Sequence, residues 1–211
     1  MNVSPSKENI LKKIRQALSE STPLPFPQAE GNTPIFQPSS PEPEVEFAQH
    51  FSKLGGKFVY CINHQELASH LNNLVAHEKW TKVFCNETAL RSVLVENLFD
   101  NFCVSPLGEC DVALTTCEAL VARTGSIVLS AAQESGRTVS VYAPVHICIA
   151  YTRQLVYDVK DALQLLKEKY GDKLPSFISF ATGPSRTADI EKTLVVGVHG
   201  PKEVYCFLVD T

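Results

Sequence analysis

Hydrophobic positions along this chain alternate between helical and strand-like spacing. Ile10, Leu11, Ile14 and Leu18 recur at helical spacing, which predicts an amphipathic helix over residues 6–19. Further helices are expected over residues 47–54, 65–76, 87–99 and 157–170, with a short helical turn at 117–121. Strands are expected over residues 57–61, 82–85, 111–115, 125–130, 138–142, 146–151, 177–181 and 203–209.

The order of these elements indicates the fold class. Strands that alternate with helices predict an α/β fold, with an open, mainly parallel sheet and flanking helices. Between residues 125 and 151 three strands follow one another with no room for a helix, which predicts an inserted β-hairpin or meander. The expected helix at residues 6–19 stands apart from this alternation as an N-terminal arm.

Seven of the thirteen prolines lie between residues 21 and 45. Proline lacks a backbone N–H, so this stretch is expected to be an extended linker rather than a helix or an interior strand. We therefore expect two parts: a helix with a proline-rich linker over 1–44, and an α/β domain over 45–211. The arm is a candidate contact with another copy of the chain, and a solvated tail explains the same residues.

Composition narrows the class of protein. The 211 residues are 44% hydrophobic and 20% charged, which suits a globular domain with a real core. A formal net charge of −4 argues against a nucleic-acid binder. No apolar run reaches the roughly 18 residues of a transmembrane helix, and the N-terminus lacks the apolar region of a secretory signal. A cytoplasmic protein is the expectation.

The seven cysteines are widely spaced and form no C-x-x-C pair. Cys103, Cys110 and Cys117 recur every seven residues, but they do not share one predicted helix. We expect free, buried thiols in a reducing compartment. No metal or iron–sulfur site is predicted in this chain.

The run from Gly183 to Gly200 is the strongest candidate for a functional site. It follows a predicted strand, and in α/β sheets ligands bind at the carboxyl ends of strands. Ser185 and Thr187 are expected to cap a helix whose first turn contains Asp189, and helix N-termini attract anions. Arg186 could bind a carboxylate in bidentate fashion. A capped helix start with an Arg186–Asp189 ion pair is the structural alternative.

Two other segments and one histidine are further candidates. Thr124 and Ser126 offer hydroxyls, and Gly125 lets either a ligand or another backbone come close. Arg137, after Gly136, either binds an anion or is an exposed turn arginine. His199 is a candidate acid/base group, and a structural hydrogen bond is the alternative. His146 is expected to be a buried, hydrogen-bonded histidine. Phosphate-loop, dinucleotide and G-x-S-x-G motifs do not occur.

These segments carry a resemblance to a known family. Residues 124–129, 136–137, 144–147, 183–191, 197–201 and 208–210 are similar to the LUD-domain family, in particular its lactate utilization protein C branch. The resemblance implies a fold of the NagB/RpiA/CoA-transferase-like type. It also implies a part in oxidising L-lactate to pyruvate, beside two partner proteins, of which one is rich in iron–sulfur motifs.

Residues and resemblance together give a functional hypothesis. The chain would be a non-redox subunit of a lactate-oxidation complex that binds a small organic acid or docks iron–sulfur oxidoreductase subunits. Arg186 would hold the carboxylate, residues 124–126 would form the opposite wall, and His199 would be the acid/base candidate. One alternative is a stand-alone ligase or transferase-like enzyme that acts on a nucleotide, CoA or folate-type substrate. Another is a scaffold that docks partners through the proline-rich segment.

Overall fold

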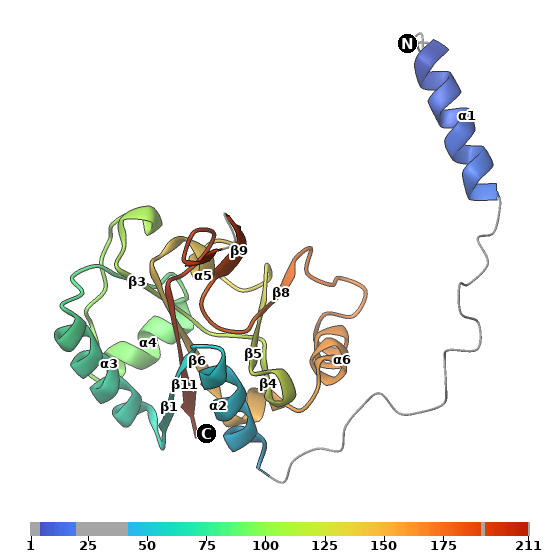
Figure 1. Ribbon diagram of the computed structural model, residues 1–211. Helices are drawn as coiled ribbons and strands as arrows, with labels where there is room; N and C mark the ends of the chain where they lie inside the picture. The colour runs from blue at the N-terminus through green and yellow to red at the C-terminus, as the bar shows by residue number, and fades with distance from the viewer. Residues whose placement is uncertain (1–4, 20–41, 191–192, 211) are drawn as a thin grey trace. The chain divides into compact units, whose positions relative to one another are not determined.

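The structure is a computed structural model that describes residues 5–19, 42–190 and 193–210 (Figure 1). The chain divides into two units, Met1–Gln37 and Pro38–Thr211. The sequence places this boundary after residue 44, and most of the predicted linker lies outside the described residues. In the first unit, helix α1 (Pro5–Ser19) confirms the predicted arm helix, and the side chains of Ile10, Leu11 and Ile14 are exposed.

The second unit is built on a five-stranded parallel sheet with strand order β1-β11-β6-β3-β2. This sheet confirms the predicted mainly parallel architecture with flanking helices. Its strands are β1 (Lys57–Cys61), β2 (Val83–Phe84), β3 (Val112–Thr115), β6 (Val145–Tyr151) and β11 (Glu203–Val209). The two central strands, β6 and β11, pair along their whole length and read as continuous apolar runs, as expected for strands covered on both faces.

Helices α3 (His64–Glu78) and α4 (Thr88–Glu96) cover one face of the parallel sheet (Figure 1). Their buried leucines, among them Leu67, Leu71 and Leu94, pack against Ile147 and Phe207 of the central strands. The helical spacing of Leu67 and Leu71 is part of the signal that located α3 in the sequence. Because no described helix is both long and apolar enough, none could cross a membrane.

The other face of the parallel sheet is covered by α2 (Pro43–Lys53) and a second sheet. That sheet has strand order β7-β4-β5-β8, with β4 (Ala119–Val121), β5 (Ser126–Ser130), β7 (Leu155–Val156) and β8 (Ile178–Ala181). Helix α6 (Val159–Tyr170) packs on its outer side, so the unit is layered from α3 and α4 to α6 (Figure 1). Pro43 opens α2 at a position where the missing N–H costs nothing.

Three short elements differ from the sequence predictions. Residues 117–121 were expected to form a helical turn, but 119–121 form strand β4, because Leu120 packs toward the parallel sheet while its neighbours pack toward α6. Residues 138–142 were expected to be a strand and instead contain helix α5 (Val139–Tyr142), whose Val139 is buried against Ala113 of β3. The hairpin expected between residues 125 and 151 is therefore formed with other partners. Strand β5 pairs antiparallel with β4 and β8.

The third difference concerns the run after β8. No helix begins within the described residues 183–190; β9 (Arg186–Ile190) and β10 (Thr193–Val196) form an antiparallel pair instead. Ala188 and Ile190 alternate with the polar residues Thr187, Asp189 and Glu191 in the sequence, a spacing that suits a strand. Short 3-10 segments η1 (Leu107–Glu109), η2 (Ala122–Thr124) and η3 (Thr152–Gln154) complete the described elements.

Candidate functional site

The β9–β10 pair changes the roles predicted for its residues. Thr187 pairs with Val195, so neither it nor Ser185 caps a helix, and the predicted helix-terminus attraction for an anion is wrong. Ser185 is held by backbone bonds: its N–H donates to the Pro201 carbonyl, and its carbonyl accepts from the Gly197 N–H, both at 2.9 Å. Asp189 lies in β9, but its side chain is outside the described part of the structure, so its pairing with Arg186 stays a prediction.

Arg186 lies at the C-terminal end of α2. Its Nη2 donates to the carbonyl of Leu54, the residue that ends the helix. Gly183 has φ +122°, and a Cβ there would lie 3.0 Å from the Leu54 oxygen, so glycine lets the turn approach the helix. Leu54, Thr182, Gly183, Pro184 and Arg186 border a cavity of about 340 Å³. A guanidinium has five N–H donors, so the bond to Leu54 leaves others for an anion in this cavity.

Residues 124–126 lie against the same helix, at the level of His50 and Phe51. Gly125 has φ +61°, and a Cβ there would lie 2.8 Å from the His50 carbonyl carbon. The sequence predicted that Gly125 makes room either for a ligand or for another backbone. The structure supports the second reason, because the backbone of α2 lies close to it. The hydroxyls of Thr124 and Ser126 are 2.8 Å apart and hydrogen-bonded to each other.

Residues 124–126 and Arg186 are on the same end of the β5–β8 pair, where Ile127 pairs with Ala181. Both also touch the C-terminal half of α2. The structure therefore brings these two predicted parts of the site close to one helix. Among the described residues, however, those that border the Arg186 cavity do not include 124–126. The expectation that they form its opposite wall remains a prediction.

His199 and Arg137 are each separate from the Arg186 cavity. His199 is exposed in the turn after β10 and borders a cavity of about 460 Å³ with Tyr142, Pro144 and Lys202. Arg137 donates to the Ser176 hydroxyl at 2.6 Å, just before β8, whereas Arg186 follows β8. Four strand residues at about 3.3 Å each separate those two ends, so the arginines cannot hold one small ligand together.

In α/β sheets ligands bind at the carboxyl ends of the parallel strands, and here those ends lie at a different edge of the molecule from the Arg186 cavity. Pro201 and Lys202 directly precede β11, and the Lys202 N–H donates to the carbonyl of Pro144, which precedes β6. Ser185, which is bonded to Pro201, therefore lies near the amino ends of the two central parallel strands. The strand whose carboxyl end it follows, β8, belongs to the second sheet.

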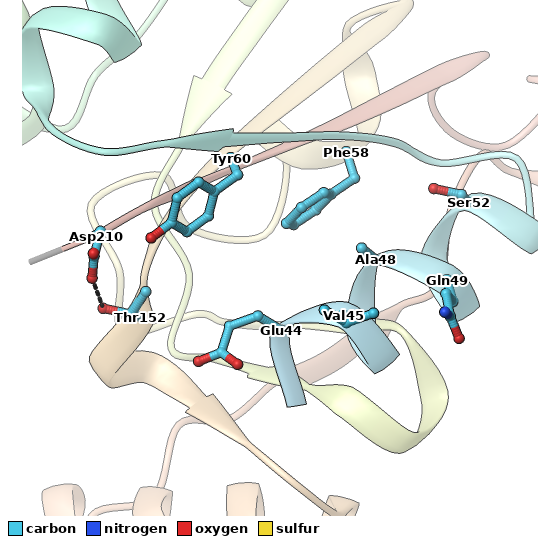
Figure 2. A pocket seen from close by; sticks show the side chains of 9 residues that line it. All are labelled: Glu44, Val45, Ala48, Gln49, Ser52, Phe58, Tyr60, Thr152 and Asp210. Atoms are coloured by element: carbon cyan, nitrogen blue, oxygen red, sulfur yellow. Dashed lines mark hydrogen bonds between the residues drawn. The ribbon is translucent and has the colours of Figure 1, made fainter. Parts of the chain in front are cut away.

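A cavity of about 970 Å³ lies at the carboxyl ends of the parallel strands (Figure 2). Phe58 and Tyr60 reach it from β1, Thr152 follows β6, and Asp210 follows β11. The Thr152 hydroxyl donates to Asp210 at 3.4 Å. A hydrogen bond to Asp210 raises the pKa of the Tyr60 phenol. Sequence reasoning missed this site, although Thr152 and Asp210 each directly follow an apolar strand.

The chemistry of this larger cavity differs from that of the Arg186 cavity. Helix α2 contributes Glu44, and the side chains of Val45 and Ala48 face Phe58 across the cavity (Figure 2). Two carboxylates, Glu44 and Asp210, and no lysine or arginine are among the described residues that line it. Such a lining suits a neutral or cationic ligand with an apolar part, and it repels phosphate and carboxylate groups.

Comparison with known proteins identifies relatives of this chain. The LUD domain family model matches residues 105–209. Lactate utilization protein C of Bacillus licheniformis is 36% identical over 104 residues, which cover 48% of this chain and 43% of that protein. The protein of the same name from Geobacillus thermodenitrificans is 28% identical over 182 residues, which cover 85% of this chain and 74% of that protein.

The first of these relatives is therefore matched over less than half of its length. A solved structure, that of a DUF162 family protein from Deinococcus radiodurans, superposes with a TM-score of 0.58. The superposition covers 80% of this chain and 96% of that one, at 18% identity, and supports the fold alone. The matched residues 105–209 include Thr124, Thr152, Arg186 and His199, whereas α2 and Asp210 lie outside them.

Proposed function

Because the chain belongs to the LUD-domain family, we propose that it serves lactate utilization as a subunit that binds a small carboxylate at Arg186. The relatives named lactate utilization protein C supply the metabolic context. The observation that carries the proposal is the exposed Arg186 guanidinium beside a cavity of about 340 Å³. A planar guanidinium pairs with a carboxylate through two parallel N–H···O bonds.

The cavity offers the other groups that a hydroxy acid needs. Thr182 borders it and brings a hydroxyl that can donate to or accept from the hydroxyl of lactate. Pro184 and Leu54 give the cavity apolar walls for a methyl group. Ser185 connects this cavity to the turn that carries His199, which remains the secondary acid/base candidate.

The proposal gives the electron-transfer step to partner proteins. Six of the seven cysteines are buried, and all of these except Cys110 lie in the apolar clusters that cover the parallel sheet. Burial raises the pKa of Cys61 to about 11 and that of Cys85 to about 12. Thiolates are the form that binds iron–sulfur clusters, and the raised pKa values oppose that form. We propose that iron–sulfur oxidoreductase subunits carry the clusters and dock on this chain.

Calorimetry with L-lactate and pyruvate tests the carboxylate site. We expect the wild type to bind and Arg186→Ala to bind at least about tenfold more weakly, since it loses charge-assisted hydrogen bonds. Arg186→Lys keeps the charge without the fork and should be intermediate. Arg137→Ala is the matched control, because Arg137 lies at the other end of β8, and it should bind like the wild type. Equal binding by all four proteins would refute the role of Arg186.

Co-expression with candidate iron–sulfur oxidoreductase subunits tests the docking role. The exposed apolar side chains of α1 make the arm a candidate contact for such a partner. If the arm docks, a chain that lacks residues 1–43 should no longer co-purify with the partners. Co-purification that survives this deletion would assign the contact to the α/β domain instead.

The cavity of about 970 Å³ favours a second candidate, an enzyme that acts on a larger substrate. Its carboxylates are unsuited to the phosphates of a nucleotide or CoA, so this candidate ranks second. A thermal-shift screen across ATP, CoA, folates and hydroxy acids separates the two. Stabilisation by ATP, CoA or a folate that survives Arg186→Ala and is lost in Asp210→Asn would favour the enzyme.

A further inference from the structure

Cys103 and Cys110 are the two ends of a short loop between α4 and β3, and their sulfurs lie 3.6 Å apart. Backbone bonds hold both ends in place. The Cys103 N–H donates to the Val83 carbonyl at 2.8 Å, and the Cys110 N–H donates to the Leu107 carbonyl at 3.3 Å. The next residue, Asp111, accepts from the N–H groups of Thr81 and Lys82. The approach of the sulfurs is therefore built into the fold around β2.

The two sulfurs differ in their access to solvent. Cys103 is partly exposed, and its neighbour Val104 is fully exposed, so a small molecule can reach this side of the pair. Cys110 is buried, and its sulfur faces the Pro106 carbonyl at 3.4 Å. The other five cysteines are buried; they are Cys61, Cys85, Cys117, Cys148 and Cys206. Access thus singles out one pair among seven thiols.

We propose that Cys103 and Cys110 form a reversible dithiol–disulfide site whose reaction partner is a low-molecular-weight disulfide, such as glutathione disulfide. The Cys103 thiolate attacks one sulfur of that compound, whose S–S bond breaks and releases one thiol. The Cys110 sulfur then attacks Cys103 in the mixed disulfide, passes its proton to solvent and releases the second thiol. Two protein thiols are oxidised, and one small disulfide is reduced to two thiols.

The order of the two attacks follows from burial. Cys103 meets the oxidant first because it is the accessible thiol. Burial raises the pKa of Cys110 to about 11, so Cys110 stays protonated and unreactive toward solvent species. Once the mixed disulfide has formed, proximity compensates for this low reactivity, because the resolving sulfur is already next to its target.

The new bond would close the loop that contains η1. Leu107 of η1 packs on the cluster formed by Ala113, Val139 and Ala143. Val139 belongs to α5, the helix whose Val141 and Tyr142 border the cavity with His199. Oxidation would therefore fix the loop that supports α5, while neither cysteine borders the Arg186 cavity. The experiment on this site needs no carboxylate ligand, so its outcome is distinguishable from that of the proposed function.

Incubation of the full-length protein with glutathione disulfide, followed by alkylation and peptide mass mapping, tests the site. The wild type should lose two hydrogen atoms and show a Cys103–Cys110 link, which dithiothreitol reverses. Its five other thiols are internal controls and should stay reduced. If the wild type remains fully reduced while a linear peptide of residues 99–114 oxidises, or if the link joins other cysteines, the proposal is wrong.

Two serine variants test the order of attack. Cys110→Ser lacks the resolving thiol and should accumulate one glutathione on Cys103. Cys103→Ser lacks the accessible thiol and should be modified at least tenfold more slowly than Cys110→Ser. Circular dichroism checks that both variants fold. Equal rates of modification in the two variants would overturn the assignment of Cys103 as the attacking residue.

Discussion

Gly125 is the residue at which backbone geometry and packing most directly limit substitution. It adopts the left-handed conformation with φ +61°, and the backbone of α2 at His50 and Phe51 occupies the space of a side chain. Gly125→Ala should lower the free energy of unfolding by about 3 kcal/mol, from the left-handed backbone and from the displacement of α2. Urea denaturation of the full chain measures this loss.

Gly136 is the matched control for that substitution. It has nearly the same backbone angle, φ +62°, but apart from Gly136 itself and its two chain neighbours no heavy atom lies within 4 Å of its ideal Cβ position. Gly136→Ala should therefore cost only about 1 kcal/mol, the cost of the backbone conformation. If both variants lose the same free energy of unfolding, contact with α2 is not what limits substitution at Gly125.

The residues of the candidate sites could be predicted only in part from the sequence. The charge of Arg186 and the turn at Gly183 pointed to an anion site in the sequence. The structure places both residues at one small cavity. The sequence did not reveal which backbone approaches Gly125, because α2 is distant along the chain. Thr152 and Asp210 were missed for the same reason: they meet only because β6 and β11 are neighbours in the sheet.

At the scale of elements, long periodic segments were predictable and short ones were not. The leucine pattern gave α3 and α6, and the apolar runs gave β6 and β11, because each buries a face that its own period defines. Segments 119–121, 139–142 and 186–190 span only a few residues each. Their conformation is decided by neighbours such as α6, β3 and β10, which override local preference.

Helix α6 is joined to the second sheet by a buried carboxylate. Glu118, just before β4, accepts from the Tyr170 and Ser130 hydroxyls at 2.7 and 2.6 Å and from Lys169 at 2.7 Å. Burial alone would raise the pKa of Glu118, but the three donors outweigh it and the pKa is lowered. The carboxylate is therefore ionised at neutral pH and depends on these donors.

Removal of one donor should weaken this junction. Tyr170→Phe keeps the ring and deletes only the hydroxyl, so we expect a loss of about 1–2 kcal/mol in the free energy of unfolding, measured by chemical denaturation. Tyr142→Phe serves as the control, because Tyr142 is 66% exposed, and it should change stability by less than about 0.5 kcal/mol. If Tyr170→Phe loses no more unfolding free energy than the control, the hydrogen bond from Tyr170 to Glu118 does not stabilise this junction.

The described α/β domain combines a parallel sheet, a second four-stranded sheet and the β9–β10 pair, and only the parallel sheet was predictable. Parallel strands with helical crossovers produce a strong alternating pattern, and this pattern predicted a mainly parallel sheet, which the structure builds from β1, β11, β6, β3 and β2. The second sheet pairs β5 with β8 across a long stretch of chain that includes β6 and α6. Such long-range pairing leaves no local signal, so β5 was assigned to a local meander with residues 138–142 and 146–151, and β4 to a helical turn.

The response of the whole molecule to acid is tied to one central side chain. His146 of β6 is buried between β3 and β11, and its Nε2 lies 2.9 Å from the Thr115 hydroxyl. Burial lowers the pKa of His146 from 6.5 to about 4. Between pH 6.5 and 4 the unfolded chain therefore binds a proton at this position that the folded chain does not, and stability falls as the pH falls.

His146→Gln removes the titration and keeps a group that can hydrogen-bond to Thr115. From pH 7 to 4.5 the wild type should lose roughly 2–3 kcal/mol more unfolding free energy than the variant, as the folded pKa of about 4 requires. Urea denaturation at several pH values measures both curves. Carboxylates such as Glu118 and Asp111 titrate in both proteins and cancel in the difference. If the two curves of unfolding free energy against pH run parallel over this range, His146 takes up its proton while the protein stays folded.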